Sequence, residues 1–420
     1  MANKKIIFLF ILVLGSFMDA YPIFPSDYRP LTLVMLLPFF PMAFIKIVNI
    51  KFNKFKLVVT LFFLYILVLS FFYSLFYFSD FTGFFDSLIT ISLAILSYSS
   101  FIIIFKYFNY TKKDFDFVFD IFSNFLLILA IIEVLSIYGL FPSIVKVIIN
   151  NIFTLSSSRR LLLINRESSW ASLTLLFVLS YFIHKNQIIK SIVTYFIIVL
   201  SFSMTGIILG TTLIIIYIFR TKEFLKVFLF FSIGILLFSF FINYYEQLFY
   251  FLGIENQYTI IRISKWIGIF KNNSENIIRN ILISDGGSTY IRVLYPLIAF
   301  LEGIKSILGL GAGNFGLMAP NYVNVYNLNT DIPLIQLLMN GHYTAIGNLY
   351  SRVVFEGGLF GLWVIFYILK YIIRIAKEFN YVFLVIPIFL VFFQFSSYIY
   401  LPFIMVLAML NFLNSKERMT

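Results

Sequence analysis

Arginines gather in a short segment that leads into a long apolar stretch. Arg159 and Arg160 precede a run of four apolar residues, and Arg166 and Glu167 lie just before Trp170. Guanidinium groups hold phosphate oxygens in a fixed, often bidentate geometry, which suits a lipid-borne diphosphate. For Arg159 and Arg160, contact with ordinary anionic headgroups or a water-facing loop position is the simpler explanation. The position of Arg166 and Glu167 at the start of a predicted helix favours a role in a binding site.

A glycine-rich segment is the second candidate site. The stretch Gly309–Gly316 begins seventeen positions after Arg292, and it contains Gly311 and Gly313. Backbone without Cβ atoms can approach a phosphate or a sugar closely and offer amide donors. The segment is not a P-loop, since no Gly-Lys-Ser/Thr follows, and it lacks the strand and βαβ unit of a dinucleotide fingerprint. A tight turn beneath a surface cap explains the glycines equally well.

A third patch joins a long loop to a predicted membrane helix. His342 and Asn348 lie on its loop side, and Arg352 and Glu356 follow, four residues apart. His342 suits either a general base or a structural hydrogen-bonding residue. Arg352 and Glu356 share one helix face, which favours an ion pair near the membrane interface over a role in a reaction.

The sequence offers little for metal or thiol chemistry. It contains no cysteine, which excludes disulfides, thiolate nucleophiles and cysteine-bound metals. His184 and His342 are its two histidines, and the segments predicted to be external contain no HExxH motif or carboxylate cluster. We therefore expect no catalytic metal and no bound cofactor.

The composition predicts an all-α integral membrane protein. Hydrophobic residues make up 61% of the 420 residues and charged residues 12%, and the mean hydropathy is +0.97. That leaves too little polar surface to cover a soluble globule of this size. The net charge of +12 is explained by cytoplasmic loops, so nucleic acid is not expected as a partner.

Apolar windows of membrane-helix length recur along almost the whole chain. A bilayer-spanning helix needs roughly 20 mostly apolar residues, and about twelve segments approach that length. The first follows Lys4 and Lys5 as in a signal peptide, but no small-x-small cleavage site follows it, so we expect a retained anchor. Glu133 in the fifth segment is a candidate functional group, because burying charge in a membrane is unfavourable. The predicted spans are Ile6–Ala20, Leu31–Ile45, Leu57–Phe78, Leu88–Phe105, Phe117–Tyr138, Trp170–Ile183, Ile188–Ser203, Gly206–Phe219, Leu225–Ile242, Asn348–Ile375, Tyr381–Phe395 and Tyr398–Leu413.

Lysines and arginines are sorted between alternate loops. Cytoplasmic loops retain positive charge because it resists translocation, and placing both termini in the cytoplasm collects most of the basic residues on that side. The predicted inside segments contain Lys4, Lys5, Lys46, Lys51, Lys54, Lys56, Lys106, Lys112, Lys113, Lys185, Lys190, Arg220, Lys222, Lys226, Lys370, Arg374, Lys377, Lys416 and Arg418.

The predicted external loops are unequal in length. Gly139–Glu167 is moderate, whereas Tyr244–Gly347 has about a hundred residues, far more than two helices need to be joined. Within it, Ile260–Lys271 mixes basic, aromatic and aliphatic residues as a helix at the headgroup level does. Tyr290–Leu308 is too charged for a free spanning helix, so we expect a cap folded back on the membrane. The predicted divisions are spans one to nine in 1–243, the loop in 244–347, and the last three spans with a short tail in 348–420.

In topology and in the order of its motifs, the chain resembles the O-antigen polymerase (Wzy) and O-antigen ligase family of bacterial membrane glycosyltransferases. The resemblance covers nearly the whole chain in topology, through its twelve predicted spans and the long external loop between the ninth and tenth, and is sparse in residues. The matching motifs are Arg166-Glu167-Ser168-Ser169 at the sixth span, Arg292 with the glycine turn after it, and Asn348…Glu356-Gly357-Gly358-Leu359-Phe360-Gly361.

The resemblance implies a reaction and its partners. A glycan is transferred from an undecaprenyl-pyrophosphate donor to a sugar hydroxyl of a second lipid-linked unit, outside the bacterial cytoplasmic membrane and without a nucleotide sugar. A flippase and a chain-length regulator are the protein partners that it implies, and membrane lipids surround the chain. Arginines can stabilise a diphosphate leaving group without a metal, and Glu167 or His342 can accept the acceptor proton. The expected residues are Arg292, Glu167 and His342 for catalysis, and Arg166, Arg159, Arg160, Asn348, Gly311 and Gly313 for substrate binding.

One departure from the family pattern distinguishes between its two activities. Ligase-like members present a His directly before the Asn of the last motif, whereas here Gly347 precedes Asn348 and His342 lies five residues earlier. This favours a polymerase over a ligase. A lipid-linked oligosaccharide flippase is a further alternative, although transporters usually show paired halves and broken helices and the sequence shows no internal repeat. A scaffold protein would leave the outer arginines and glycines unexplained.

Overall fold

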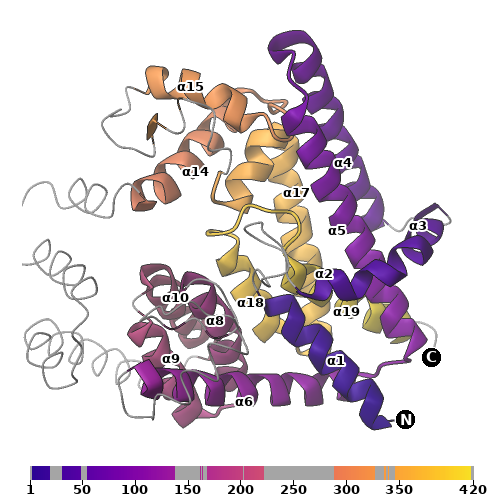
Figure 1. Ribbon diagram of the computed structural model, residues 1–420, viewed down its shortest axis with the longest axis vertical. Coiled ribbons are helices and arrows are strands. Elements are labelled where there is room, and N and C mark those ends of the chain that lie inside the picture. The colour runs from indigo at the N-terminus through magenta and orange to yellow at the C-terminus, as the bar shows by residue number, and fades with distance from the viewer. Residues whose placement is uncertain are drawn as a thin grey trace, which may run out of the picture. The chain divides into compact units, whose positions relative to one another are not determined.

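The structure, a computed structural model, describes residues 2–18, 31–48, 54–137, 161, 163, 168–201, 203–221, 288–326, 335–336, 339 and 346–417. Every element among these residues is a helix, as the composition predicts (Figure 1). The elements are α1 (Ala2–Phe17), α2 (Leu31–Leu36), η1 (Leu37–Phe39), α3 (Phe40–Val48), α4 (Lys54–Tyr73), η2 (Ser74–Phe78), α5 (Thr82–Tyr107), α6 (Lys112–Ile137), α8 (Ser168–His184), α9 (Ile188–Leu200), α10 (Met204–Thr221), α14 (Ser288–Lys305), α15 (Phe315–Val325), α17 (Leu349–Phe379), α18 (Val382–Val391) and α19 (Leu401–Glu417).

Four described helices are long and apolar enough to cross a membrane. Every predicted span overlaps a described helix except Leu225–Ile242, which lies outside the described residues, as does Ile260–Lys271. The count of twelve spans and the extent of the long loop stay predictions. The four helices are Lys54–Phe78, Thr82–Tyr107, Lys112–Leu135 and Leu349–Phe379.

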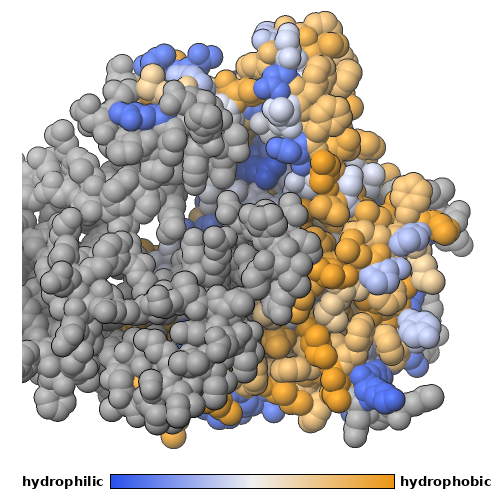
Figure 2. Space-filling view, viewed as in Figure 1, coloured by the Kyte–Doolittle hydropathy of each residue, from blue (hydrophilic) through white to orange (hydrophobic). Residues whose placement is uncertain are grey.

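An exposed apolar stripe runs along α4. Residues spaced three or four apart share one side of a helix, and those on this side are hydrophobic and at least a third exposed. Figure 2 shows hydrophobic side chains gathered on this flank of the molecule. Water-soluble proteins rarely expose so continuous a patch, so the stripe is suited to contact with lipid. Its residues are Leu57, Leu61, Leu64, Val68, Phe71, Phe72 and Leu75.

The chain forms two compact units, each built from separate stretches of sequence: 1–32 with 113–277, and 33–112 with 278–420. In the first, α1 is joined to α6 by an ion pair of 2.7 Å between Lys5 Nζ and Asp114 Oδ2. Tyr181 of α8 donates its hydroxyl to Asp120 Oδ1 of α6 at 2.8 Å. In the described part of this unit α8 packs on α9 and α10, and the two polar contacts join α6 to α1 and to α8.

Glu133, the ionisable residue predicted within a span, also lies in the first unit. Its side chain is buried, and its Oε2 accepts a hydrogen bond of 2.8 Å from the backbone amide of Leu163. Leu163 has a positive φ of 52°, so the carboxylate stabilises a turn that is strained for a branched side chain. The sequence could not have identified this partner, thirty residues away.

The second unit is built around the antiparallel neighbours α4 and α5. The connection between them is short, and Asp80 Oδ1 accepts hydrogen bonds from the amide and the hydroxyl of Thr82 at the start of α5. These hydrogen bonds lower the pKa of the Asp80 carboxyl. α19 packs on α5, and α17 packs on both α4 and α14. α14 and α15 thereby lie against the first turns of α17 (Figure 1).

The helix predicted as one continuous span, Asn348–Ile375, is interrupted in the structure. α17 runs from Leu349 to Phe379, but Gly358 within it has φ 57° and ψ −139°. The helix therefore consists of a short arm, 349–357, and a long arm, 359–379. The long arm alone measures about 31 Å at 1.5 Å per residue, enough to cross a bilayer. The pattern of apolar residues did not reveal the break because it continues on both sides of it.

Candidate functional site

The break in α17 is closed by the glycine-rich turn. The carbonyls of Phe355 and Glu356, left without helical partners, accept hydrogen bonds from the amides of Leu310 (2.9 Å) and Gly311 (3.1 Å). The amide of Leu359 donates in turn to the carbonyl of Ile307 at 2.9 Å. Unpaired backbone groups are very unfavourable inside an apolar bundle, so the turn makes the break possible.

Position 358 requires a residue without a side chain. Its backbone conformation lies in a region that is essentially restricted to glycine. An added Cβ would collide with the carbonyl of Ile307 and come within 2.5 Å of the amide of Gly309. The Gly357-Gly358 pair of the sequence is thus explained by backbone geometry and close packing at this position.

The glycine turn is also pressed against α4 and α5. Gly311 and Gly313 have φ values of 79° and 78°. A Cβ on Gly311 would lie 2.5 Å from the amide nitrogen of Ser70, and one on Gly313 would collide with the carbonyl of Gly83. The geometry is that of a tight turn, one of the two explanations open from the sequence. Contact of Gly311 and Gly313 with substrate stays a prediction.

Arg352 and Glu356 form the ion pair that their spacing predicts. Arg352 Nε lies 2.8 Å from Glu356 Oε1, and the Glu356 side chain is 2% exposed. The same oxygen accepts the amide of Gly313 at 3.3 Å, and Oε2 accepts the hydroxyl of Tyr398 at 2.6 Å. We call Arg352, Glu356, Tyr398 and Gly313 the Glu356 network. Because donors reach both carboxylate oxygens, the buried charge is compensated.

The guanidinium of Arg352 also contacts the segment before α19. Its Nη1 donates to the carbonyl of Ser396 at 3.0 Å. Its central carbon lies 4.6 Å from the centre of the Tyr398 ring, in cation–π geometry. Arg352 therefore holds the short arm of α17 against the segment before α19. Tyr398 and Ser396 were missed by sequence reasoning, and no local pattern indicates them, since they lie more than forty residues away.

Asn348 caps the amino end of α17. Its Oδ1 accepts the amide of Ser351 at 3.1 Å, and the residue is buried. This is the usual role of Asn at a helix start. The predicted contact of Asn348 with substrate is not tested by this geometry and stays a prediction.

Arg292 lies in α14, and the structure brings that part of α14 to the amino end of α17. Pro296, one turn or about 6 Å along the helix from Arg292, is 4.0 Å from the Cβ position of Gly347, the residue before Asn348. Farther along α14, an added Cβ on Gly303 would collide with the carbonyl of Val354 in the short arm. α14 therefore lies closely along the short arm.

The far end of α14 carries a second ion pair. Lys305 Nζ donates to Glu302 Oε1 at 2.7 Å, and the Tyr326 hydroxyl donates to the same oxygen at 2.5 Å. Burial alone would raise the pKa of Glu302, but the hydrogen bonds from Lys305 and Tyr326 outweigh it and lower that pKa. The same bond raises the pKa of Lys305. Their spacing of three residues was a signal that sequence reasoning did not use.

The remaining predicted site residues lie outside the described residues: Arg159, Arg160, Arg166, Glu167 and His342. Within the described part of the chain, no group of three or more His, Asp or Glu side chains is placed to hold a metal ion. No family model, curated protein or solved structure matches this chain. The expectation of glycan transfer therefore depends on the resemblance in topology and in the order of the motifs.

Proposed function

We propose that this chain is a multi-pass membrane polymerase of surface polysaccharide. It transfers a glycan from an undecaprenyl-pyrophosphate donor to the sugar hydroxyl of a lipid-linked acceptor, on the outer face of the bacterial cytoplasmic membrane. Both termini lie in the cytoplasm and about twelve helices cross the bilayer. The observation that best supports this proposal is that α14 brings the position of Arg292 to the amino end of the short arm of α17.

Contacts among helix ends in the second unit support one common inner side. Lys416, near the end of α19, donates to Asn109 Oδ1 after α5 at 2.7 Å. The hydroxyl of Tyr381, which follows α17, donates to the carbonyl of Lys112 at 3.3 Å. These are the segments in which lysine and arginine concentrate in the sequence, as cytoplasmic ends of membrane helices do.

The broken helix supports a site on the opposite side of this unit. Irregular backbone within a membrane is tolerated only where protein buries it or where it lines a cavity. Here the short arm, the glycine turn and the first turn of α5 at Gly83 meet, on the side of the unit away from the inner helix ends. The Glu356 network fixes the short arm there. Arg352, Glu356 and Tyr398 are positioning residues in this proposal, because their charged and polar groups are bound to one another.

The chemistry requires a stabilised leaving group and a base. The bond between the donor sugar and the diphosphate breaks, and a new bond forms between that sugar and the acceptor oxygen. The lipid diphosphate leaves with the bonding electron pair, and the acceptor proton passes to Glu167 or His342. The guanidinium of Arg292 stabilises the charge that develops on the diphosphate, and the positive end of the α17 dipole adds to it. Arg166 is the second arginine that the sequence predicts for this role.

Disruption of the gene in its native host, with variants supplied back, tests the proposal. Surface polysaccharide is separated by size on a gel, with wild type, Arg292→Ala and the control Arg374→Ala, whose side chain is 78% exposed near the other end of α17. We expect single repeat units without the gene, long chains with wild type and with Arg374→Ala, and single units with Arg292→Ala at normal protein level. An unchanged ladder on disruption would reject the proposal.

A lipid-linked oligosaccharide transporter is the second candidate. The break at Gly358 favours it, because discontinuous helices form the substrate sites of many transporters. The same disruption separates the two functions. A transporter defect leaves lipid-linked repeat units on the cytoplasmic side, whereas a polymerase defect leaves single units on the outer side.

A further inference from the structure

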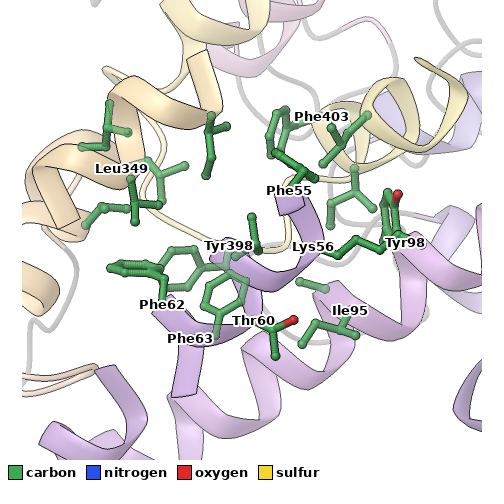
Figure 3. Close-up of a pocket in the computed structure, with 18 of the residues that line it drawn as sticks. Phe55, Lys56, Thr60, Phe62, Phe63, Ile95, Tyr98, Leu349, Tyr398 and Phe403 are labelled. Atoms are coloured by element: carbon green, nitrogen blue, oxygen red, sulfur yellow. The ribbon is translucent and has the colours of Figure 1, made fainter. Parts of the chain in front are cut away.

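A large apolar cavity lies inside the second unit. Its volume is about 280 Å³, and its wall is almost wholly hydrophobic. Side chains of α3, α4, α5, α17, α18 and α19 line it, as does the segment before α19. Figure 3 shows Phe62, Phe63 and Tyr398 grouped on one part of the wall, and Lys56 extending beside Tyr98 on another. A cavity of this composition suits a hydrocarbon chain and not a sugar or a free anion.

One end of the cavity is basic. Lys56 lines it, and Ile47, the neighbour of Lys46, lines it from α3. Lys46 and Lys106 lie in the last turns of α3 and α5, which pack on each other, and Lys56 lies in the first turn of α4. The three positive charges are therefore near one another and repel. Three like charges gathered beside an apolar cavity are complementary to a phosphate that is attached to an apolar chain.

We propose that this cavity binds an anionic phospholipid of the inner leaflet. One acyl chain occupies the apolar cavity, and the headgroup phosphate lies among Lys46, Lys56 and Lys106. The inference requires that the chain spans a membrane, as proposed above, but it does not require glycan transfer.

The position of the basic end excludes the lipid-linked donor as the occupant. Lys46, Lys56 and Lys106 are near the cytoplasmic ends of their helices, whereas the glycine turn contacts Ser70 and Gly83 at the other ends of α4 and α5. A donor that reacts on the outer face cannot place its diphosphate among these lysines. The acyl chain instead extends toward Tyr398, whose hydroxyl binds Glu356. The lipid thus fills the space behind the Glu356 network and stabilises it.

Native mass spectrometry of the purified full-length protein tests the inference. Phosphatidylglycerol and phosphatidylcholine with identical acyl chains are titrated against wild type, the triple variant Lys46→Gln, Lys56→Gln, Lys106→Gln, and a control triple variant. The control substitutes the exposed residues Lys112, Lys113 and Lys185 by Gln. We expect wild type and control to retain phosphatidylglycerol at least about tenfold better than phosphatidylcholine, and the test variant to lose that preference.

Two further measurements distinguish binding of the acyl chain from binding of the headgroup. Ala94 lines the cavity, so Ala94→Phe should reduce retention of both lipids by filling it. Glycerol phosphate, which has the headgroup charge without the chain, should not raise the melting temperature, whereas phosphatidylglycerol should.

Equal retention of the two lipids by wild type, or an unchanged preference in the test variant, would overturn the proposal. Equal stabilisation by glycerol phosphate would indicate a simple anion site and would also overturn it. If the triple variant fails to fold, the exposed Lys106→Gln alone should lower retention of phosphatidylglycerol about fivefold. None of these measurements depends on polymerisation, so failure here and failure of the proposed function are distinguishable.

Discussion

Two of the ion pairs in the described part of the second unit look alike in sequence and differ in their surroundings. Arg352 and Glu356 are 17% and 2% exposed in their side chains, whereas Lys305 and Glu302 are 61% and 18% exposed. Both pairs lie on helices at spacings of four and three residues, and both acidic groups accept a tyrosine hydroxyl. Exposed pairs contribute little to stability, but removing one partner of a buried pair leaves an uncompensated charge.

The difference shows how a charged pair becomes structural. The Glu356 side chain also accepts the amide of Gly313, so its loss would remove one of the hydrogen bonds that hold the turn closing the helix break. Among the described residues, Glu302 links α14 to Tyr326, which directly follows α15. The buried pair therefore connects three parts of the unit, which are the short arm of α17, the glycine turn and the segment before α19. The exposed pair connects two.

The largest expected effect comes from breaking the buried pair. Glu356→Ala should lower the free energy of unfolding by about 3–5 kcal/mol, because Arg352 is left buried without its carboxylate. The measurement is thermal unfolding of the detergent-purified protein, with Glu302→Ala as the matched control. The double variant Arg352→Met, Glu356→Leu should recover most of the loss, since apolar residues of similar size leave no unpaired charge. Equal effects of Glu356→Ala and Glu302→Ala would contradict the comparison.

The next effect concerns the break that the Glu356 network holds. Gly358→Ala should destabilise the protein by about 1–3 kcal/mol through backbone strain alone, and the collision with Ile307 adds to this. The control is Gly210→Ala in α10, where the added Cβ would meet side chains and no backbone: the Tyr195 ring at 3.3 Å and Leu176 at 3.6 Å. The stabilities of the two variants are compared by limited proteolysis and by their melting temperatures. A Gly358→Ala protein as stable as the control would show that the break is not required.

A smaller effect sharpens the role of Tyr398. Tyr398→Phe removes one donor to a buried carboxylate and should cost about 1.5–3 kcal/mol, the range for hydrogen bonds to charged groups. Tyr350→Phe is the matched control, because its hydroxyl donates at 2.9 Å to the neutral carbonyl of Phe389. That loss should be about 0.5–1.5 kcal/mol. Indistinguishable melting temperatures would show that the charge of Glu356 does not strengthen the bond.

The smallest effect belongs to the exposed pair and depends on pH. The pKa of Glu302 is lowered in the folded state, so its contribution is present above the pKa of the unfolded chain and is lost as pH falls through the folded value. The difference in melting temperature between wild type and Glu302→Gln should be small near pH 7. It should shrink as the pH falls below the ordinary pKa of a glutamate and vanish below the lowered pKa of the folded state. The raised pKa of Lys305 keeps its contribution until strongly alkaline pH. A difference that grew on acidification would contradict the assigned hydrogen bonds.

Much of the described fold follows from local properties of the sequence. Long apolar windows predicted helices at α4, α5 and α6, because a membrane leaves few other ways to satisfy backbone hydrogen bonds. The spacing of four residues between Arg352 and Glu356 predicted that they form an ion pair. The sidedness of lysine and arginine predicted that these loops share one side of the membrane, and the contacts of Lys416 and Tyr381 bring three of the segments together.

The tertiary structure decided the features that join distant residues. The break at Gly358 depends on a turn about forty-five residues earlier, whose amides satisfy the carbonyls of Phe355 and Glu356. The hydroxyl that completes the Glu356 carboxylate comes from Tyr398, forty-two residues later. Helix periodicity describes only which residues share a face, so it predicts neither such a partner nor a cavity. The partner and the cavity depend on which helix faces meet in three dimensions. Close packing at Gly311, Gly313 and Gly358 determines which faces meet.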